Sequence, residues 1–154
     1  MGTRRITYKD AAVLVCLVFT LAAGWSLLYY SPNALFLAAV KGNPDDVRAV
    51  VRRGIDVNST YCSSTALLQA AAAGRLDNVD VLLSLGANVN TKNGFGHTAI
   101  ALAAGRGKKA VVERLLRAGA DPGITDKRGH NAVDLALESK EFDIAAALSA
   151  RLER

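Results

Sequence analysis

The side chains best suited to metal chemistry in this sequence are two histidines and two cysteines, and their spacing decides whether they can share an ion. His97 and His130 are 33 residues apart, and neither Cys16 nor Cys62 is near them. Structural zinc sites use four ligands, which sequences supply as closely spaced Cys and His pairs. We therefore expect no metal site and no cofactor, and we interpret the two histidines as polar loop residues.

Neither a phosphate loop nor a catalytic group of side chains emerges from the sequence. The segment Gly105-Arg106-Gly107-Lys108-Lys109 resembles a phosphate loop, but the G-x-x-x-x-G-K-[ST] spacing is missing. Acidic residues recur where second helices are expected to begin, at Asp45, Asp46, Asp77 and Asp80. Carboxylates there complement the helix dipole, so they need no catalytic explanation. We expect no enzyme and no small-molecule substrate.

Composition narrows the class of partner. The 154 residues carry a formal net charge of +5, which favours acidic partners or anionic surfaces. Aromatic residues make up only 6% of the chain, too few for the stacking platforms of proteins that bind single-stranded nucleic acids. We expect no nucleic-acid partner.

These residues are carried on a repeated segment. Related stretches begin at Leu37, Gln69 and Leu102, and a weaker fourth copy begins at Asn131. Each of the first three copies contains two glycines twelve residues apart: Gly42 and Gly54, Gly74 and Gly86, Gly107 and Gly119. A fixed period of 32 or 33 residues is the signature of a solenoid of stacked supersecondary units.

Each unit is expected to contain two short antiparallel helices. The apolar faces in the second copy are Leu67, Ala70 and Ala71 for the first helix and Val79, Leu82 and Leu83 for the next. Gly74 and Gly86 are predicted to end these helices in the left-handed conformation that glycine adopts most easily. Turn residues such as Asn93-Gly94 predict that the links between units project as hairpin-like fingers.

The chain resembles the ankyrin repeat family from about residue 33 to its end, in period, glycine phase, Ala-Ala pair and Gly-Ala-Asp/Asn-Val-Asn ending. The resemblance implies an all-α ankyrin repeat solenoid with repeats at about 33–64, 65–97 and 98–130 and a C-terminal cap at 131–154. The family's Thr-Pro-Leu-His opening is reduced to Thr65-Ala66-Leu67-Leu68 and Thr98-Ala99-Ile100-Ala101. The first finger is one residue short, and the cap has Lys140 in place of a glycine, with its charges expected to face outward.

Ankyrin repeats generally bind proteins, and the resemblance implies contacts from the finger tips and the exposed end of each first helix. Carried onto this sequence, those positions are Val40, Lys41, Tyr61, Cys62, Ser64, Ala72, Ala73, Gly94, Phe95, His97, Gly105, Arg106, Lys127, Arg128 and His130. We expect Tyr61, Phe95 and Arg106 to be the main anchors, because exposed aromatic and arginine side chains dominate binding energy. The alternative for Phe95 is packing between fingers, and for the basic residues a solvated face.

The first thirty residues are expected to include a membrane segment. Residues 11–30 contain no formal charge and are long enough to cross a bilayer as a helix. The preceding residues 1–10 carry a net charge of +2, so the N-terminus is expected in the cytoplasm and residues 31–154 outside it, in a bacterial inner membrane and periplasm. A cleaved signal peptide, which would release a soluble periplasmic protein, is the alternative.

Two other features have competing interpretations. Asn58-Ser59-Thr60 matches the N-glycosylation sequon, but in the ankyrin pattern Asn58 is simply the asparagine that closes a repeat. Cys62 is either a small structural residue or a thiol able to cross-link a partner.

Together these expectations describe a membrane-tethered, non-enzymatic module that binds a partner protein at the extracytoplasmic face. Such a protein would act as an accessory, shielding or immunity-type factor. The alternative is a structural protein that organises the envelope through self-association or contact with lipid headgroups.

Overall fold

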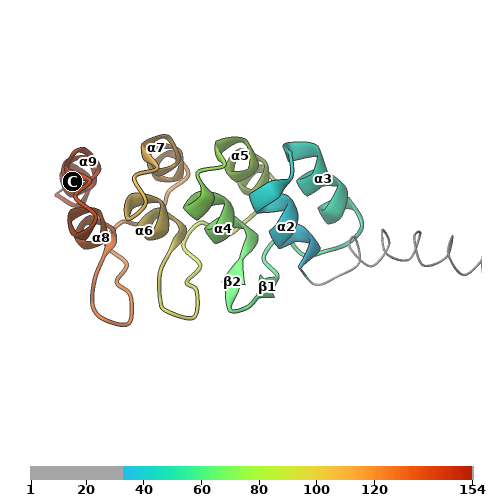
Figure 1. Ribbon diagram of the computed structural model, residues 1–154, viewed down its shortest axis with the longest axis horizontal. Helices are drawn as coiled ribbons and strands as arrows, with labels where there is room; N and C mark the ends of the chain where they lie inside the picture. Colours follow the sequence, from blue (N-terminus) through green and yellow to red (C-terminus); the bar gives the residue numbers. More distant parts are fainter. Residues whose placement is uncertain (1–32, 154) are drawn as a thin grey trace, which may run out of the picture. The chain divides into compact units, whose positions relative to one another are not determined.

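The computed structural model describes residues 33–153, which form eight helices in four consecutive pairs (Figure 1). The pairs are α2 (Ala34–Lys41) with α3 (Pro44–Arg52), α4 (Ala66–Ala73) with α5 (Leu76–Ser84), α6 (Ala99–Ala104) with α7 (Lys109–Arg117), and α8 (Ala132–Glu138) with α9 (Phe142–Leu152). The stack of short helix pairs expected from the period is therefore confirmed.

The helices lie in two layers. Figure 1 shows α2, α4, α6 and α8 in one row, α3, α5, α7 and α9 in a second row, and the connecting fingers extending from the first row. Neighbouring helices of a row pack together, since α6 contacts both α4 and α8, and α5 contacts both α3 and α7. Fully buried alanines such as Ala39, Ala71 and Ala103 allow this close approach.

Glycine ends the helices of the second pair as predicted. Gly74 directly follows α4 with φ 72°, and Gly86 follows the end of α5 with φ 90°. An L-residue pays about 1–2 kcal/mol to adopt such a conformation. Lys140 occupies the corresponding position of the last pair and has φ 63°, so the turn keeps its left-handed backbone without a glycine.

The acidic residues near helix starts have two different roles. Asp45, Asp46 and Asp77 lie in the first turns of α3 and α5, where they complement the helix dipole as predicted. The same prediction for Asp80 is wrong, because Asp80 is the fifth residue of α5 and forms an ion pair with Arg114 of α7. The pair joins two neighbouring units.

Side chains that follow or belong to one helix pair also donate hydrogen bonds to carbonyl groups at the end of the first helix of the preceding pair. Asn78 donates hydrogen bonds to the end of α2, Arg106 Nη1 donates to the Ala72 carbonyl (3.3 Å), and Ser139 Oγ donates to the Gly105 carbonyl (2.8 Å). The last carbonyls of a helix have no partner within the helix. These bonds give such carbonyls a donor from the next helix pair, and they connect consecutive pairs.

The first finger contains a short β-hairpin, which the all-α prediction did not include. Strands β1 (Thr60–Tyr61) and β2 (Ser64–Thr65) pair antiparallel, with Tyr61 opposite Ser64. The two residues between the strands, Cys62 and Ser63, have φ 50° and 59°. Positive φ at both central residues is what a type I′ hairpin turn requires.

The expected membrane anchor, residues 11–30, lies outside the described residues. Within residues 33–153 no helix is both long and apolar enough to span a membrane.

Candidate functional site

The second finger lies between α5 and α6, and the third between α7 and α8. Both have the same internal hydrogen-bond frame, in which one side-chain oxygen accepts from two backbone N–H groups. Asn93 Oδ1 accepts hydrogen bonds from the backbone N–H groups of Phe95 (2.9 Å) and His97 (3.0 Å). Asp126 Oδ1 does the same for Arg128 (2.7 Å) and His130 (2.9 Å). This is the turn chemistry for which Asn and Asp are favoured, and it fixes both loops.

Backbone hydrogen bonds join neighbouring fingers. The Gly94 N–H donates to the Ser63 carbonyl (2.8 Å), and the Lys127 N–H donates to the Phe95 carbonyl (3.1 Å). A Cβ atom on Gly96 would lie 2.9 Å from Lys127 N, so the third finger approaches the second closely at that glycine. The fingers therefore form one connected surface.

The side chains of His97 and Asp126 connect the same two fingers. His97 Nε2 lies 3.2 Å from Asp126 Oδ2, and the Asp126 side chain is only 2% exposed. Burial opposes ionisation of this carboxyl, but hydrogen bonds from the His130 and Arg128 N–H groups and from His97 outweigh it and lower the pKa of Asp126. The carboxylate is thus held in its charged form inside the loop.

Phe95 stands out on this surface because its side chain is 72% exposed. Its ring centroid lies 6.2 Å from that of His97 in the same finger. The Phe95 backbone, rather than its ring, makes the bond to the third finger. Lys127 and Arg128 are exposed on that next finger. We call Tyr61, Phe95, Lys127 and Arg128, the exposed large side chains of the finger tips, the finger face.

The other predicted anchors are more constrained. Tyr61 is exposed, and its ring makes an edge contact with Phe36 of α2 at a centroid distance of 5.6 Å. Arg106 is exposed but donates to the Ala72 carbonyl, so it has a structural role as well. Lys41 is exposed at the end of α2.

The remaining predicted contact residues divide by exposure. Cys62, Ala73 and Gly94 are exposed, whereas Val40, His97, Gly105 and His130 are half-buried. Ser64 and Ala72 are buried, and their prediction as contact residues is wrong. Ser64 faces inward in the hairpin, where its Oγ accepts a hydrogen bond from Gln69 (3.1 Å), and Ala72 packs in the stack. The position of a residue on a finger or at a helix end did not tell whether its side chain faces solvent or the interior.

The histidines are engaged with carboxylates rather than arranged for a metal. His97 faces Asp126, and His130 Nδ1 lies 3.1 Å from Glu138 Oε1 of α8. No group of three or more metal-ligating side chains occurs among the residues that the structure describes. Cys62 is an exposed free thiol at the tip of the first hairpin.

Asn58 has the structural role that its place in the repeat predicts. Its Nδ2 donates to the Gly86 carbonyl (3.2 Å), and its Oδ1 accepts from Asn88 N (2.8 Å). Asn90 bonds the Asp121 N–H of the next unit in the same way (2.9 Å). A sugar on Asn58 would modify the nitrogen that makes the bond to Gly86.

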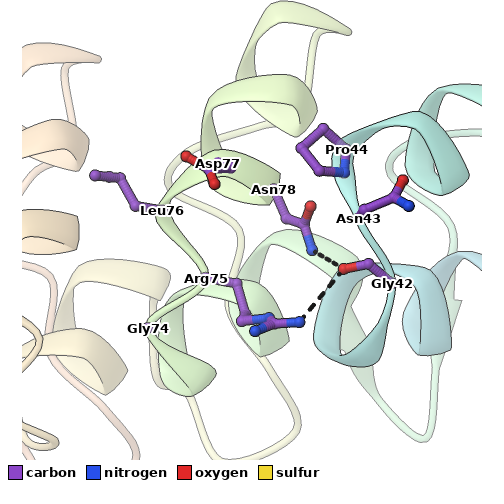
Figure 2. A pocket seen from close by; sticks show the side chains of 8 residues that line it. All are labelled: Gly42, Asn43, Pro44, Gly74, Arg75, Leu76, Asp77 and Asn78. Carbon is purple, nitrogen blue, oxygen red and sulfur yellow. Dashed lines mark hydrogen bonds between the residues drawn. The ribbon is translucent and has the colours of Figure 1, made fainter.

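A second surface feature, a pocket of about 360 Å³ between the first two helix pairs, was not predicted (Figure 2). Its lining residues are Gly42, Asn43, Pro44, Gly74, Arg75, Leu76, Asp77 and Asn78. Figure 2 shows Asn78 and Arg75 both directed at the Gly42 carbonyl. Asn78 Nδ2 donates to that oxygen at 3.1 Å and to the Ala39 carbonyl at 2.9 Å. Asn78 Oδ1 is buried without a hydrogen-bond partner among residues 33–153.

Aligning the repeats marks Asn78 as an unusual residue for its position. Asn78 occupies the position held by Val111 in the next copy, so a buried position that is apolar in one unit is polar in another. The geometry explains the exception, since the amide caps α2. The pocket walls therefore serve the stack, and the finger face remains the better candidate for binding.

Comparison with known proteins agrees with the geometry. The family model described as ankyrin repeats, in three copies, matches residues 15–93 and 67–153. No curated protein matches the chain.

Proposed function

Because the chain belongs to the ankyrin repeat family, we propose that it is a non-enzymatic module that binds one partner protein through its finger face. The observation that carries this proposal is the exposure of Phe95 on a finger whose backbone is fixed by hydrogen bonds on both sides. Aromatic side chains are enriched among the residues that contribute most to protein–protein binding energy, and Phe95 is the most exposed of the large apolar side chains among residues 33–153. Phe95 is the expected centre of the contact.

The hydrogen-bond frame of the fingers lowers the conformational entropy that is lost on binding. Phe95 N bonds Asn93 Oδ1 within the finger, and Phe95 O accepts from Lys127 N of the next finger. A loop that is already ordered loses little conformational entropy when a partner binds. The finger face can therefore present its aromatic side chain in one position.

The charges around Phe95 suggest the chemistry of the partner. Lys127 and Arg128 are exposed beside it. Arg128 Nε lies 3.9 Å from Asp126 Oδ2 and is partly offset by that carboxylate, whereas no ion pair of Lys127 occurs among residues 33–153. Complementary charges steer association and select partners. We expect the partner to present an apolar pocket bordered by acidic side chains.

We further propose that the module is tethered to a membrane by residues 11–30, with the N-terminus in the cytoplasm and the ankyrin repeats on the extracytoplasmic side. The uncharged run and its basic flank support this topology. A bacterial inner membrane with the repeats in the periplasm fits best. A C-terminal reporter active only outside the cytoplasm tests the topology, and the intact mass of the product distinguishes an anchor from a cleaved signal.

At that location the module would act as an accessory, shielding or immunity-type protein that covers an envelope enzyme or a toxin. Such a role predicts a one-to-one complex.

Site-specific photo-cross-linking tests the binding surface directly. A photoreactive phenylalanine at position 95 in the full-length chain should capture one partner protein, which mass spectrometry would identify. The matched control is the same residue at position 85, because Leu85 is exposed at the end of α5, away from the finger tips. Equal capture at both positions would refute the assignment.

The partner so identified allows an affinity measurement. Phe95→Ala should weaken binding by at least tenfold, which is the loss expected for a central aromatic anchor. Leu85→Ala should leave the affinity unchanged. Arg106→Glu also tests the surface, but its bond to Ala72 means that its stability must be measured in parallel.

A further inference from the structure

The second finger contains a dipeptide, Asn93-Gly94, that can react without any other protein. Each of the other asparagines in the sequence precedes a residue with a side chain, whereas Asn93 precedes a glycine. Asparagine is a thermally labile residue, and a following glycine, which has no Cβ, leaves its own backbone nitrogen open for attack on the asparagine side chain. Asn93 is half-buried and Gly94 is exposed, so water reaches the pair.

The reaction joins two groups of the same dipeptide. The Gly94 nitrogen attacks Cγ of Asn93, a new C–N bond closes a cyclic succinimide, and the amide nitrogen leaves as ammonia with the proton of the Gly94 N–H. Water then opens the ring at either of its carbonyl carbons. Attack at Cγ gives aspartate, whereas attack at the main-chain carbonyl carbon gives isoaspartate, in which the main chain runs through the former side chain.

The fold holds both reacting groups. Asn93 Oδ1 accepts hydrogen bonds from the N–H groups of Phe95 (2.9 Å) and His97 (3.0 Å), which fix the side chain that is attacked. The attacking nitrogen is held from outside its own finger, because the Gly94 N–H donates to the Ser63 carbonyl of the first finger at 2.8 Å. This nitrogen must give up that bond before it can turn toward Cγ.

The contact between the first two fingers also explains why a glycine follows Asn93. A Cβ atom on Gly94 would lie 3.0 Å from Ser63 Cβ, so a side chain there would push the first finger away. The third finger has Asp126 and Lys127 at the corresponding positions, and Lys127 N reaches the Phe95 carbonyl at 3.1 Å with its side chain in place. The labile pair is thus a consequence of the close approach of the first two fingers.

We propose that Asn93 is a modification site at which the chain deamidates itself, and that the contact between Gly94 and Ser63 sets the rate. When the first finger moves away, the Gly94 nitrogen is released for the attack. The inference does not depend on the proposed partner protein, because both reacting groups belong to this chain.

The two products have different effects on the finger face. Aspartate at position 93 keeps the hydrogen-bond frame, as Asp126 Oδ1 does when it accepts the N–H groups of Arg128 and His130 in the third finger. Isoaspartate adds a methylene group to the main chain before Phe95, so the side-chain acceptor and the Phe95 N–H no longer lie in register. The isoaspartate form therefore loses the frame that fixes Phe95, and deamidation limits the lifetime of the finger face.

The rates of deamidation in the folded and unfolded chain test the proposal. The full-length protein in mild detergent is incubated at neutral pH, with and without enough urea to unfold it, and peptides that contain Asn93 are followed by mass spectrometry. The folded chain should deamidate at least about tenfold more slowly, because the fingers must first open. Equal rates with and without urea would overturn the proposal.

A variant of the first finger separates the local contact from overall stability. Ser63 has φ 59°, which proline cannot adopt, so Ser63→Pro should displace the carbonyl and speed deamidation of the folded chain. Gly119→Ala is the matched control, because Gly119 has φ 84° and a Cβ there meets no atom within 4 Å, so the substitution strains the backbone without touching the first finger. Circular dichroism checks that both variants are folded. Equal acceleration in both would show that overall stability sets the rate, which would overturn the proposal.

Hydrogen exchange provides a readout of the products. The Lys127 N–H donates to the Phe95 carbonyl, so its exchange reports the contact between the second and third fingers. The isoaspartate form, separated by chromatography, should exchange this hydrogen faster than the wild type, whereas Asn93→Asp should exchange it at the wild-type rate. An isoaspartate form with wild-type exchange would refute the loss of the frame.

Discussion

His97 of the second finger lies 3.2 Å from Asp126 of the third, measured from Nε2 to Oδ2, and the two side chains link loops 29 residues apart. The same carboxylate accepts two backbone N–H groups of its own finger through Oδ1. Asp126 therefore holds its loop and joins it to the neighbouring loop.

Acid should weaken the finger frame through Asp126. Its pKa is lower in the folded protein than in the unfolded chain, so the carboxylate stabilises the fold fully above the ordinary carboxyl pKa of about 3.9. This stabilisation is lost as the pH falls through the lower pKa of the folded state. Chemical unfolding followed between pH 6 and pH 2.5 should show a loss of free energy of unfolding below about pH 4.

The variant Asp126→Asn isolates this contribution. An amide oxygen keeps the two backbone hydrogen bonds, as Asn93 shows in the second finger, but it does not titrate. The difference in free energy of unfolding between wild type and variant should shrink as the pH falls. A difference that is constant across this range would contradict the lowered pKa.

Gly96→Ala should destabilise the protein more than Gly86→Ala. Both glycines have nearly the same φ, 89° and 90°, so both substitutions pay about 1–2 kcal/mol for the left-handed backbone. A Cβ on Gly96 also meets the backbone of the third finger at 2.9 Å, whereas a Cβ on Gly86 meets no atom within 4 Å. Urea unfolding of the two variants measures the extra cost of separating the fingers, and equal losses would contradict the close approach.

Asn78→Ala should cost about 1–3 kcal/mol of stability, because it leaves carbonyls at the end of α2 without their donor. Asn78→Val is the control for packing, since the next copy has Val111 at this position. The valine variant fills the space but restores no hydrogen bond. If valine recovers the wild-type stability, the cap is not what Asn78 contributes.

Lys140→Gly should stabilise the last helix pair by about 0.5–1 kcal/mol. Lys140 has φ 63° at the position where Gly74 and Gly107 stand, and glycine removes the steric cost while adding a smaller entropic one. Lys140→Ala gives the control, because alanine removes the charged side chain but keeps the Cβ. Thermal unfolding at low protein concentration should show a higher midpoint for the glycine variant only.

The sequence by itself determined the repeat, the helix pairs and the turns between them. Each depends on local chemistry: an apolar face at helical spacing, a glycine where φ must be positive, and an Asn or Asp that bonds its own loop. Gly74, Gly86 and Asn58 all behave as predicted for this reason. Because the same local features recur every 33 residues, the sequence also indicates a stack of similar helix pairs.

Only the tertiary structure decided which side chains are exposed and which join the units. Ser64 and Ala72 are buried although their elements reach the surface, and Leu137 is exposed although its counterparts Ala71 and Ala104 are not. Asn78 reaches a helix end about 40 residues earlier in the chain. Exposure and such bonds depend on what the neighbouring unit places against a side chain, and a pattern within one unit does not contain that information.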